Sequence, residues 1–206
     1  MTYKVNDIFY SLQGEGHNAG CPAIFIRFSG CNLQCSFCDT DFSQYKKMTA
    51  TEIIDSLKIC IKEYIPTNSN VSSEGKGLRD NILCVLTGGE PTLQVDEELI
   101  DMLHSEGFKV AMESNGTILP PKNLDWFTVS PKNNPTVKHC NELKVLFDDS
   151  GDVNDFGISA DYYYLQPCDM NDKERNSTIN KHCVDYILKH PRWRLSVQTH
   201  KLLNFK

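Results

Sequence analysis

The feature that most constrains the fold of this chain is a succession of short apolar segments, each ended by a turn containing Gly, Pro, Asn or Ser. Segments of this length and pattern are typical of buried strands. We predict strands at residues 23–28, 81–86, 108–113, 126–130, 143–147, 162–166 and 194–198. Helical patterns separate several of them, and strands that alternate with helices form a parallel sheet.

Three helices are predicted, at residues 49–65, 95–106 and 177–189. Thr49 and Glu52 have the spacing of a capping box, and Gly107 has the position of a glycine that ends a helix. Few helical patterns occur in the second half of the chain, and a full barrel needs about 250 residues. The sequence therefore predicts an α/β fold, an incomplete parallel (β/α) barrel that lacks helices in its second half, as one domain over residues 1–206. A doubly wound sheet is the alternative architecture.

Charge and hydropathy exclude some classes of partner. The chain has 27 acidic and 21 basic residues, a net charge of −6, which argues against a nucleic-acid-binding face. The longest aliphatic run, residues 82–86, is far shorter than the roughly 18 residues of a membrane helix. The first residues lack the apolar stretch of a signal peptide, so we expect a cytoplasmic protein without a membrane partner.

Three of the nine cysteines are crowded together as Cys31-Asn-Leu-Gln-Cys35-Ser-Phe-Cys38, directly after the first predicted strand. Such spacing lets three thiolates bind one inorganic centre. A [4Fe–4S] cluster usually has four cysteine ligands, so three would leave one iron open to another ligand. The alternative is a zinc site completed by Cys21, His17 or a more distant residue.

Polar segments follow the predicted strands at four further places. These segments are Thr87-Gly-Gly-Glu-Pro91, Glu113-Ser-Asn-Gly116, Ser130-Pro-Lys132 and Gln166-Pro-Cys-Asp169. Each alone is typical of a turn. Parallel barrels carry their active sites at the carboxyl ends of the strands, so the four together indicate one functional face.

The cysteine triplet, Phe37 before its last cysteine, and the Gly-Gly-Glu-Pro turn resemble the radical S-adenosylmethionine (radical SAM) superfamily. The resemblance implies a full or partial parallel β/α barrel. It also implies a [4Fe–4S] cluster on Cys31, Cys35 and Cys38, whose open iron chelates S-adenosylmethionine, and a one-electron cleavage that yields an adenosyl radical.

A second set of motifs resembles one branch of that superfamily, the 7-carboxy-7-deazaguanine synthase family. The motifs are Gln13-Gly-Glu-Gly16, Gly20-x-Pro22, Phe25-x-Arg27-x-Ser29-Gly-Cys31, Cys38-Asp39-Thr40, Val129-Ser-Pro-Lys132, Tyr164-Leu-Gln-Pro167 and Val197-Gln-Thr-His200. That family converts 6-carboxy-5,6,7,8-tetrahydropterin to 7-carboxy-7-deazaguanine and ammonia in queuosine and deazapurine biosynthesis. The resemblance implies a requirement for magnesium, a one-electron donor such as a flavodoxin, and a homodimer.

The resemblance also implies roles for residues that match the family's motifs. Those expected to bind S-adenosylmethionine are Phe37, Cys38, Asp39, Gly89, Glu113, Asn115, Ser130, Pro131, Lys132, Gln166, Pro167, Cys168 and Asp169. Those expected to bind the pterin are Leu12, Gln13, Gly14, Arg27, Thr87 and, through its terminal carboxylate, Lys206. Arg27 suits a carboxylate because its guanidinium is a planar cation, and Thr40 offers the kind of oxygen that Mg²⁺ prefers.

Two other functions share part of this pattern. A radical SAM activase, which forms a glycyl radical on a partner protein, has the triplet and the Gly-Gly-Glu-Pro turn but does not need Gln13-Gly-Glu-Gly16 or Cys38-Asp39-Thr40. A zinc-stabilised binding module needs only the cysteines. Metal analysis separates the module from both enzymes, since it would contain zinc without iron or acid-labile sulfide.

Overall fold

The computed structural model describes residues 1–35, 38, 41, 43–65, 82–151 and 153–206. Contacts divide these residues into two compact units. Unit 1 consists of Met1–Leu12, Cys21–Glu113 and Pro120–Trp126. Unit 2 consists of Gln13–Gly20, Ser114–Leu119 and Phe127–Lys206.

Unit 1 is built on five strands in the order β3-β1-β2-β4-β5. Their bounds are β1 Thr2–Leu12, β2 Pro22–Phe28, β3 Lys46–Thr49, β4 Leu83–Gly88 and β5 Lys109–Ser114. β2, β4 and β5 are parallel neighbours, which confirms the expected parallel arrangement for the three predicted strands. β1 runs antiparallel to both β2 and β3, so this edge of the sheet is not parallel.

β1 and β3 have no counterpart among the predicted strands. Tyr3, Val5 and Phe9 of β1 are buried, but the register of β1 against β2 shifts between Val5 and Asp7. A bulge of this kind breaks the period-2 alternation that identifies a strand from sequence. Asn6 and Asp7 at the bulge are also residues depleted in strands.

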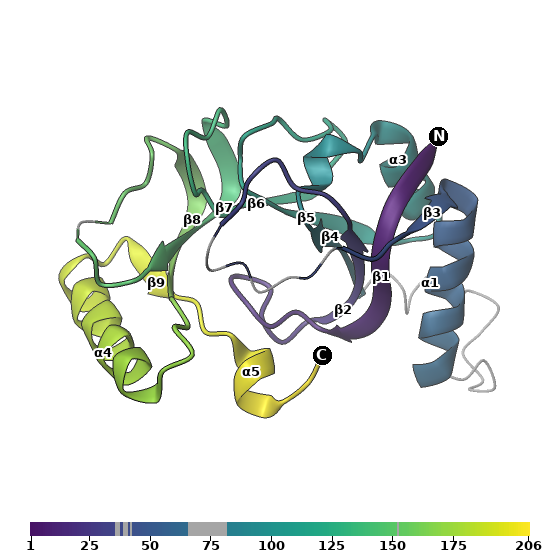
Figure 1. Cartoon of the computed structure of the whole chain (residues 1–206). Coiled ribbons are helices and arrows are strands. Elements are labelled where there is room, and N and C mark those ends of the chain that lie inside the picture. The colour runs from purple at the N-terminus through teal and green to yellow at the C-terminus, as the bar shows by residue number, and fades with distance from the viewer. Residues whose placement is uncertain (36–37, 39–40, 42, 66–81, 152) are drawn as a thin grey trace. The chain divides into compact units, whose positions relative to one another are not determined.

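The helices of unit 1 agree with the sequence. α1 is Ala50–Tyr64, and the hydrogen bonds between Thr49 and Glu52 form the predicted capping box. α3 is Glu97–Ser105, and Gly107 after it has a φ of +88°, as expected of a glycine at a helix end. A short 3₁₀ helix, η1 Pro91–Leu93, follows β4. Figure 1 shows α1 beside β1 and β3, on which it packs.

Apart from Trp126, which belongs to unit 1, unit 2 contains the parallel neighbours β6 Trp126–Val129, β7 His139–Phe147, β8 Ser159–Pro167 and β9 Trp193–Leu195. These elements confirm the four predicted strands, although β7 and β8 begin earlier than expected and β9 is shorter. No helix occurs in the described residues that connect β6 to β7 or β7 to β8, as predicted for the second half. α4 is Lys173–Lys189 and packs on β8 and β9 (Figure 1).

A short helix near the end of the chain, α5 Thr199–Leu203, was not predicted. Among the described residues, no helix combines the length and the hydropathy that crossing a membrane requires.

Candidate active site

In unit 1, the Gly-Gly-Glu-Pro turn is joined to the backbone that leads into the cysteine triplet. The amide of Gly89 donates to the carbonyl of Phe28 (2.8 Å), and the amide of Glu90 donates to the carbonyl of Gly30 (2.8 Å). A Cβ on Gly89 would overlap the carbonyl oxygen of Gly30, so only glycine allows this approach. The two motifs, far apart in sequence, therefore lie against each other before Cys31.

Glu90 of this turn is fully buried. Its Oε1 accepts hydrogen bonds from the amide (3.1 Å) and the hydroxyl (2.6 Å) of Thr92 and so caps η1, which begins at Pro91. Glu90 thus holds the conformation of the turn that carries Gly89, the residue expected to contact the cofactor.

The cysteine loop is described in part. The amide of Leu33 donates to Sγ of Cys31 (3.4 Å), and the amide of Cys38 donates to the carbonyl of Cys35 (3.2 Å). Burial raises the pKa of Cys31, the hydrogen bond from the Leu33 amide lowers it, and the nearby Glu90, Cys35 and Cys38 raise it further. Three cysteine side chains within eight residues can together ligate one iron–sulfur cluster through their thiolates.

The chemistry of this donor set therefore fits a [4Fe–4S] cluster. Within the described part of the chain, no three His, Cys, Asp or Glu side chains stand in positions that hold a metal ion. Cluster binding by Cys31, Cys35 and Cys38 consequently stays a prediction. Phe37, Asp39 and Thr40, expected at the cofactor and magnesium sites, lie outside the described residues.

Strand register in unit 1 lines up Arg27, Thr87 and Glu113. Arg27 on β2 pairs with Thr87 on β4, and one residue earlier on β4 Leu86 pairs with Met112 on β5. Side chains alternate along a strand, so Arg27, Thr87 and Glu113 share one face near the carboxyl ends of three neighbouring strands. The same face is apolar farther back, where Ala23, Val85 and Ala111 pack together.

Arg27 lies against an aromatic pair. Its guanidinium carbon is 5.0 Å from the centre of the Phe9 ring, which stacks on the ring of Phe25 at 4.9 Å. Stacking restrains the guanidinium plane while the N–H groups at its edge keep their direction for a planar anion. This geometry suits the binding of a carboxylate.

In unit 2, the segment around Asn115 lies against the segment around Ser130. The amide of Ser130 donates to the carbonyl of Ser114 (2.8 Å), and Nζ of Lys132 donates to Oγ of Ser130 (2.7 Å). Oδ1 of Asn115 accepts hydrogen bonds from the amide and hydroxyl of Thr117, which fixes the turn after β5. The structure thus brings Asn115 close to Ser130 and Lys132, all of which are expected to bind the cofactor. Glu113, expected to bind it as well, belongs to unit 1.

The segment from Gln166 to Asp169 comprises the last two residues of β8 and the two residues that follow it. The amide of Cys168 donates to the carbonyl of Phe147 (2.8 Å). The carboxylate of Asp169 accepts from the amide of Asn171 and from the side chains of Lys201 and Asn176. In that order, these contacts lower the pKa of Asp169 to about 2, so the turn is held by an ionised carboxylate.

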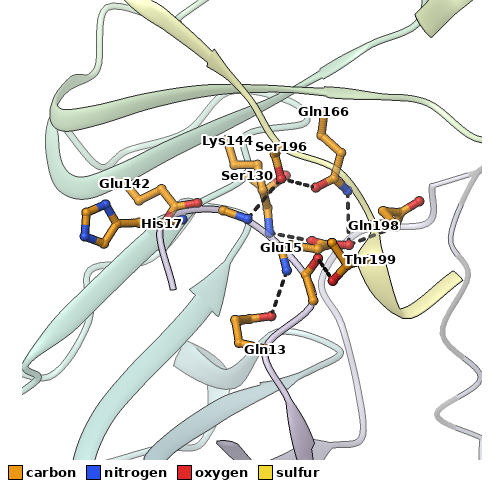
Figure 2. A network of polar contacts seen from close by, with 12 residues as sticks. Gln13, Glu15, His17, Ser130, Glu142, Lys144, Gln166, Ser196, Gln198 and Thr199 are labelled. Carbon is orange, nitrogen blue, oxygen red and sulfur yellow. Dashed lines mark hydrogen bonds and ion pairs between the residues drawn. The ribbon is translucent and has the colours of Figure 1, made fainter. Parts of the chain in front are cut away.

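The glycine-rich segment Gln13–Gly20 belongs to unit 2 and carries most of the network in Figure 2. Oε1 of the buried Gln13 accepts from the amide of Glu15 (3.3 Å), and the carbonyl of Gly14 accepts from the amide and hydroxyl of Thr199 (3.0 Å each). Leu12 ends β1 in unit 1 and is 39% exposed. Lys206 is exposed at the end of the chain, after α5.

Comparisons with known proteins find both similar sequences and a similar structure. Residues 25–130 match the Radical SAM superfamily. The 7-carboxy-7-deazaguanine synthase of Bacteroides thetaiotaomicron is 41% identical over 100% of both chains. That of Caulobacter vibrioides is 42% identical over 98% of this chain and 99% of the relative. The crystal structure of QueE from Escherichia coli superposes with a TM-score of 0.71 at 26% identity, covering 96% of this chain and 94% of that one.

The chain belongs to the 7-carboxy-7-deazaguanine synthase family. This membership confirms the resemblance drawn from the motifs, the radical SAM type of α/β fold with an incomplete barrel, and the enzyme class. The cofactors of this radical SAM enzyme are a [4Fe–4S] cluster and S-adenosylmethionine.

The sequence analysis assigned no role to Glu15 or Lys144, which form an ion pair within unit 2. Nζ of Lys144 lies 2.6 Å from Oε2 of Glu15, and the lysine side chain is only 6% exposed. A signal was present, since Glu142 and Lys144 alternate with apolar residues in the predicted strand and the residues just before it. Charged residues in such a strand are rarely buried unless they are paired.

Proposed function

We propose that the chain catalyses the radical-mediated ring contraction of 6-carboxy-5,6,7,8-tetrahydropterin to 7-carboxy-7-deazaguanine, with release of ammonia, in queuosine or deazapurine biosynthesis. The observation that carries the proposal is the double backbone hydrogen bond between the Gly-Gly-Glu-Pro turn and the residues before Cys31. The same compact unit holds the carboxylate-binding geometry of Arg27. Family membership supports the reaction.

When bound, the cluster and S-adenosylmethionine supply the radical that abstracts hydrogen from C6 of the pterin. The thiolates of Cys31, Cys35 and Cys38 would hold the cluster, and the backbone at Gly89 would contact the cofactor. The remaining cofactor contacts would come from Phe37, Cys38, Asp39, Glu113, Asn115, Ser130, Pro131, Lys132, Gln166, Pro167, Cys168 and Asp169.

The pterin would be bound by residues that can read its polar groups. Arg27 would pair with the substrate carboxylate through two parallel N–H donors, and Thr87, next to it in register, would offer a hydroxyl. Gln13, Gly14 and Leu12 would contact the ring amide, and Lys206 would contribute its terminal carboxylate. Thr40 would supply an oxygen to Mg²⁺.

Four further features belong to this proposal. The chain would act as a single radical SAM domain over residues 1–206 and as a homodimer. A one-electron donor such as a flavodoxin would reduce the cluster. No disulfide joins any of the nine cysteines, all of which lie among the described residues, and this agrees with a reducing compartment such as the cytoplasm.

The decisive experiment is the mass of the product after anaerobic incubation with the pterin, S-adenosylmethionine, Mg²⁺ and a reductant. We expect a product lighter than the pterin by one ammonia. A hydrogen isotope placed on C6 of the substrate should appear in S-adenosylmethionine. Finding no deazaguanine, with glycyl-radical formation on a partner protein, would instead identify an activase.

The metal sites are tested separately. Cys31→Ala, Cys35→Ala and Cys38→Ala should each abolish the iron–sulfur absorbance after reconstitution, and zinc without iron or sulfide would refute the cluster. Thr40→Ala should flatten the dependence of the initial rate on Mg²⁺ while the cluster stays intact. An unchanged magnesium dependence would remove Thr40 from the metal site.

A further inference from the structure

Glu15 is a carboxylate with both oxygens engaged in a largely buried network (Figure 2). Its Oε2 contacts Nζ of Lys144 (2.6 Å), and its Oε1 accepts from Nε2 of Gln198 (2.8 Å) and Nε2 of Gln166 (3.2 Å). The side chains of Glu15 and Lys144 are 19% and 6% exposed. Removing two charges from water is costly, and apolar residues often replace such a pair without loss of stability. Folding stability alone therefore does not explain the pair.

The residues on either side of Glu15 are fixed by the same network. The carbonyl of Gly14 accepts two hydrogen bonds from Thr199. The amide of Gly16 donates to Oγ of Ser196 (3.0 Å), whose hydroxyl donates to Oε1 of Gln166 (3.0 Å). The glycine-rich backbone is therefore held at three consecutive residues.

Gly16 is itself a close fit. Its φ is +66°, and a Cβ there would overlap the carboxylate of Glu142, which accepts from the amide of His17 (3.1 Å). The segment thus lies directly on β7, where Glu142 and Lys144 project from alternate positions of the same strand.

The contacts of Glu15 reach two parts of unit 2 that our proposed function assigns to the pterin. One is the segment at Gln13 and Gly14. The other is the end of the chain, because Gln198 directly precedes α5 and the terminal residues. The Glu15 carboxylate bonds to Gln198 of the C-terminal part and to Lys144 of β7, and Glu15 itself belongs to the glycine-rich part. It therefore connects both parts to the sheet.

We infer that Glu15 and Lys144 are positioning residues for the pterin: their ion pair sets the glycine-rich segment and the C-terminal segment in the arrangement that binds it. The inference rests on the proposed function. It goes beyond that function because it assigns a role to two residues that act through their neighbours.

The ion pair is permanent at physiological pH. Burial alone would raise the pKa of Glu15, but the charge and hydrogen bond of Lys144 and the hydrogen bond of Gln198 lower it to about 2. The carboxylate is therefore ionised across the neutral range and provides a fixed anchor.

The kinetic test compares Glu15→Gln and Lys144→Met with the wild-type holoenzyme while the pterin concentration is varied. We expect the KM for the pterin to rise at least about tenfold and kcat to change less than about threefold, because the loss is one of substrate binding. Cluster absorbance and the cleavage of S-adenosylmethionine without pterin should stay at the wild-type level. Lys144→Arg keeps the charge, so its KM for the pterin should lie close to the wild-type value.

Glu106→Gln is the matched control. Glu106 forms an ion pair with Lys58 at 2.8 Å in unit 1, so the same chemical change is made in a pair that shares no residue with the network. It should leave KM and kcat unchanged. An unchanged KM for the pterin in Glu15→Gln would overturn the inference. A higher KM together with a lower kcat and a lost cluster would also overturn it, because that combination indicates a purely structural role.

Amide hydrogen exchange tests the same inference without substrate. The amides of Gly16 and Thr199 are both hydrogen-bonded within the network. Glu15→Gln should raise the exchange rates of both segments together in the holoenzyme, and unchanged exchange would overturn the inference. If the wild type made no product from the pterin while exchange rose as expected, the proposed function would fail and the assignment to the pterin with it, and only the conclusion that the ion pair holds the two segments would stand.

Discussion

Replacing Lys144 by methionine should destabilise the protein, because it leaves the Glu15 carboxylate buried without its cation. In the native structure Nζ of Lys144 lies 2.6 Å from Oε2 of Glu15, and the two side chains are 6% and 19% exposed. Methionine is an unbranched side chain of similar shape, so the substitution removes the charge and changes the packing little.

Two estimates of the energetic cost agree. Removing one partner of a buried ion pair costs about 3–5 kcal/mol. Although burial raises the pKa of Glu15, its contacts with Lys144 and Gln198 lower it from 4.5 to about 2. A shift of this size corresponds to roughly 3 kcal/mol of folding free energy at neutral pH. For a chain of this length, a loss of about 3 kcal/mol lowers the thermal midpoint by about 6–12 °C.

The pH dependence follows from the sign of the shift. The pKa of Glu15 is lower in the folded state than its ordinary value of 4.5, so the stabilisation is complete above that pH. It is lost as the pH falls from 4.5 toward about 2. Wild-type protein should therefore lose stability over this interval, and Glu15→Gln should lose less.

The assay is thermal unfolding of reconstituted protein under anaerobic conditions, followed by far-ultraviolet circular dichroism at pH 7. The double variant Glu15→Gln/Lys144→Met removes both charges and should recover at least half of the loss seen in Lys144→Met. A midpoint for Lys144→Met within about 2 °C of wild type would refute the reasoning. So would a double variant less stable than Lys144→Met.

Three further predictions concern the cofactor and substrate segments. Gly89→Ala should raise the KM for S-adenosylmethionine and reduce turnover, because a Cβ would overlap the carbonyl oxygen of Gly30; initial rates at varied cofactor concentration measure it. Arg27→Ala should raise the KM for the pterin by about 10- to 150-fold, the equivalent of a lost charge-assisted contact worth about 1.5–3 kcal/mol. Lys201→Ala removes a half-exposed ion pair with Asp169 and should lower the free energy of unfolding by less than about 1 kcal/mol, as measured by denaturant titration.

Matched variants control the first two changes. Gly157→Ala adds a Cβ that meets no atom within 4 Å; its φ of +65° strains the backbone locally, but the variant should keep the wild-type KM for S-adenosylmethionine. Arg27→Lys keeps the charge but loses the planar guanidinium. Its KM for the pterin should therefore lie between those of the wild type and Arg27→Ala. A wild-type cofactor KM in Gly89→Ala would contradict the steric argument. A decrease in the free energy of unfolding well above about 1 kcal/mol in Lys201→Ala would contradict the third prediction. It would mean that the contacts of Asp169 with Asn171 and Asn176 do not hold the turn without Lys201.

Much of the fold could be predicted because its signals are local. The capping box at Thr49 and Glu52 and the helix end at Gly107 depend on residues within one turn of a helix, and the structure has both. The strands of the parallel part were identified from apolar runs between turns. The family motifs around Cys31 and Gly89 are also contiguous, so the sequence alone sufficed to identify the family and the candidate cofactor segments.

The tertiary structure decided the features that depend on pairing. β1 escaped prediction because its bulge between Val5 and Asp7 interrupts the alternation, and only its antiparallel partners establish it as a strand. Glu15 and Lys144 are 129 residues apart, and no local pattern records that they meet. Strand register and chain crossing bring them together, and the cost of burying each charge makes the partner essential. From the sequence, Glu15 is one member of a glycine-rich motif; in the folded chain its carboxylate holds that motif to β7 and to the residues before α5, because each of its oxygens has a donor from another segment.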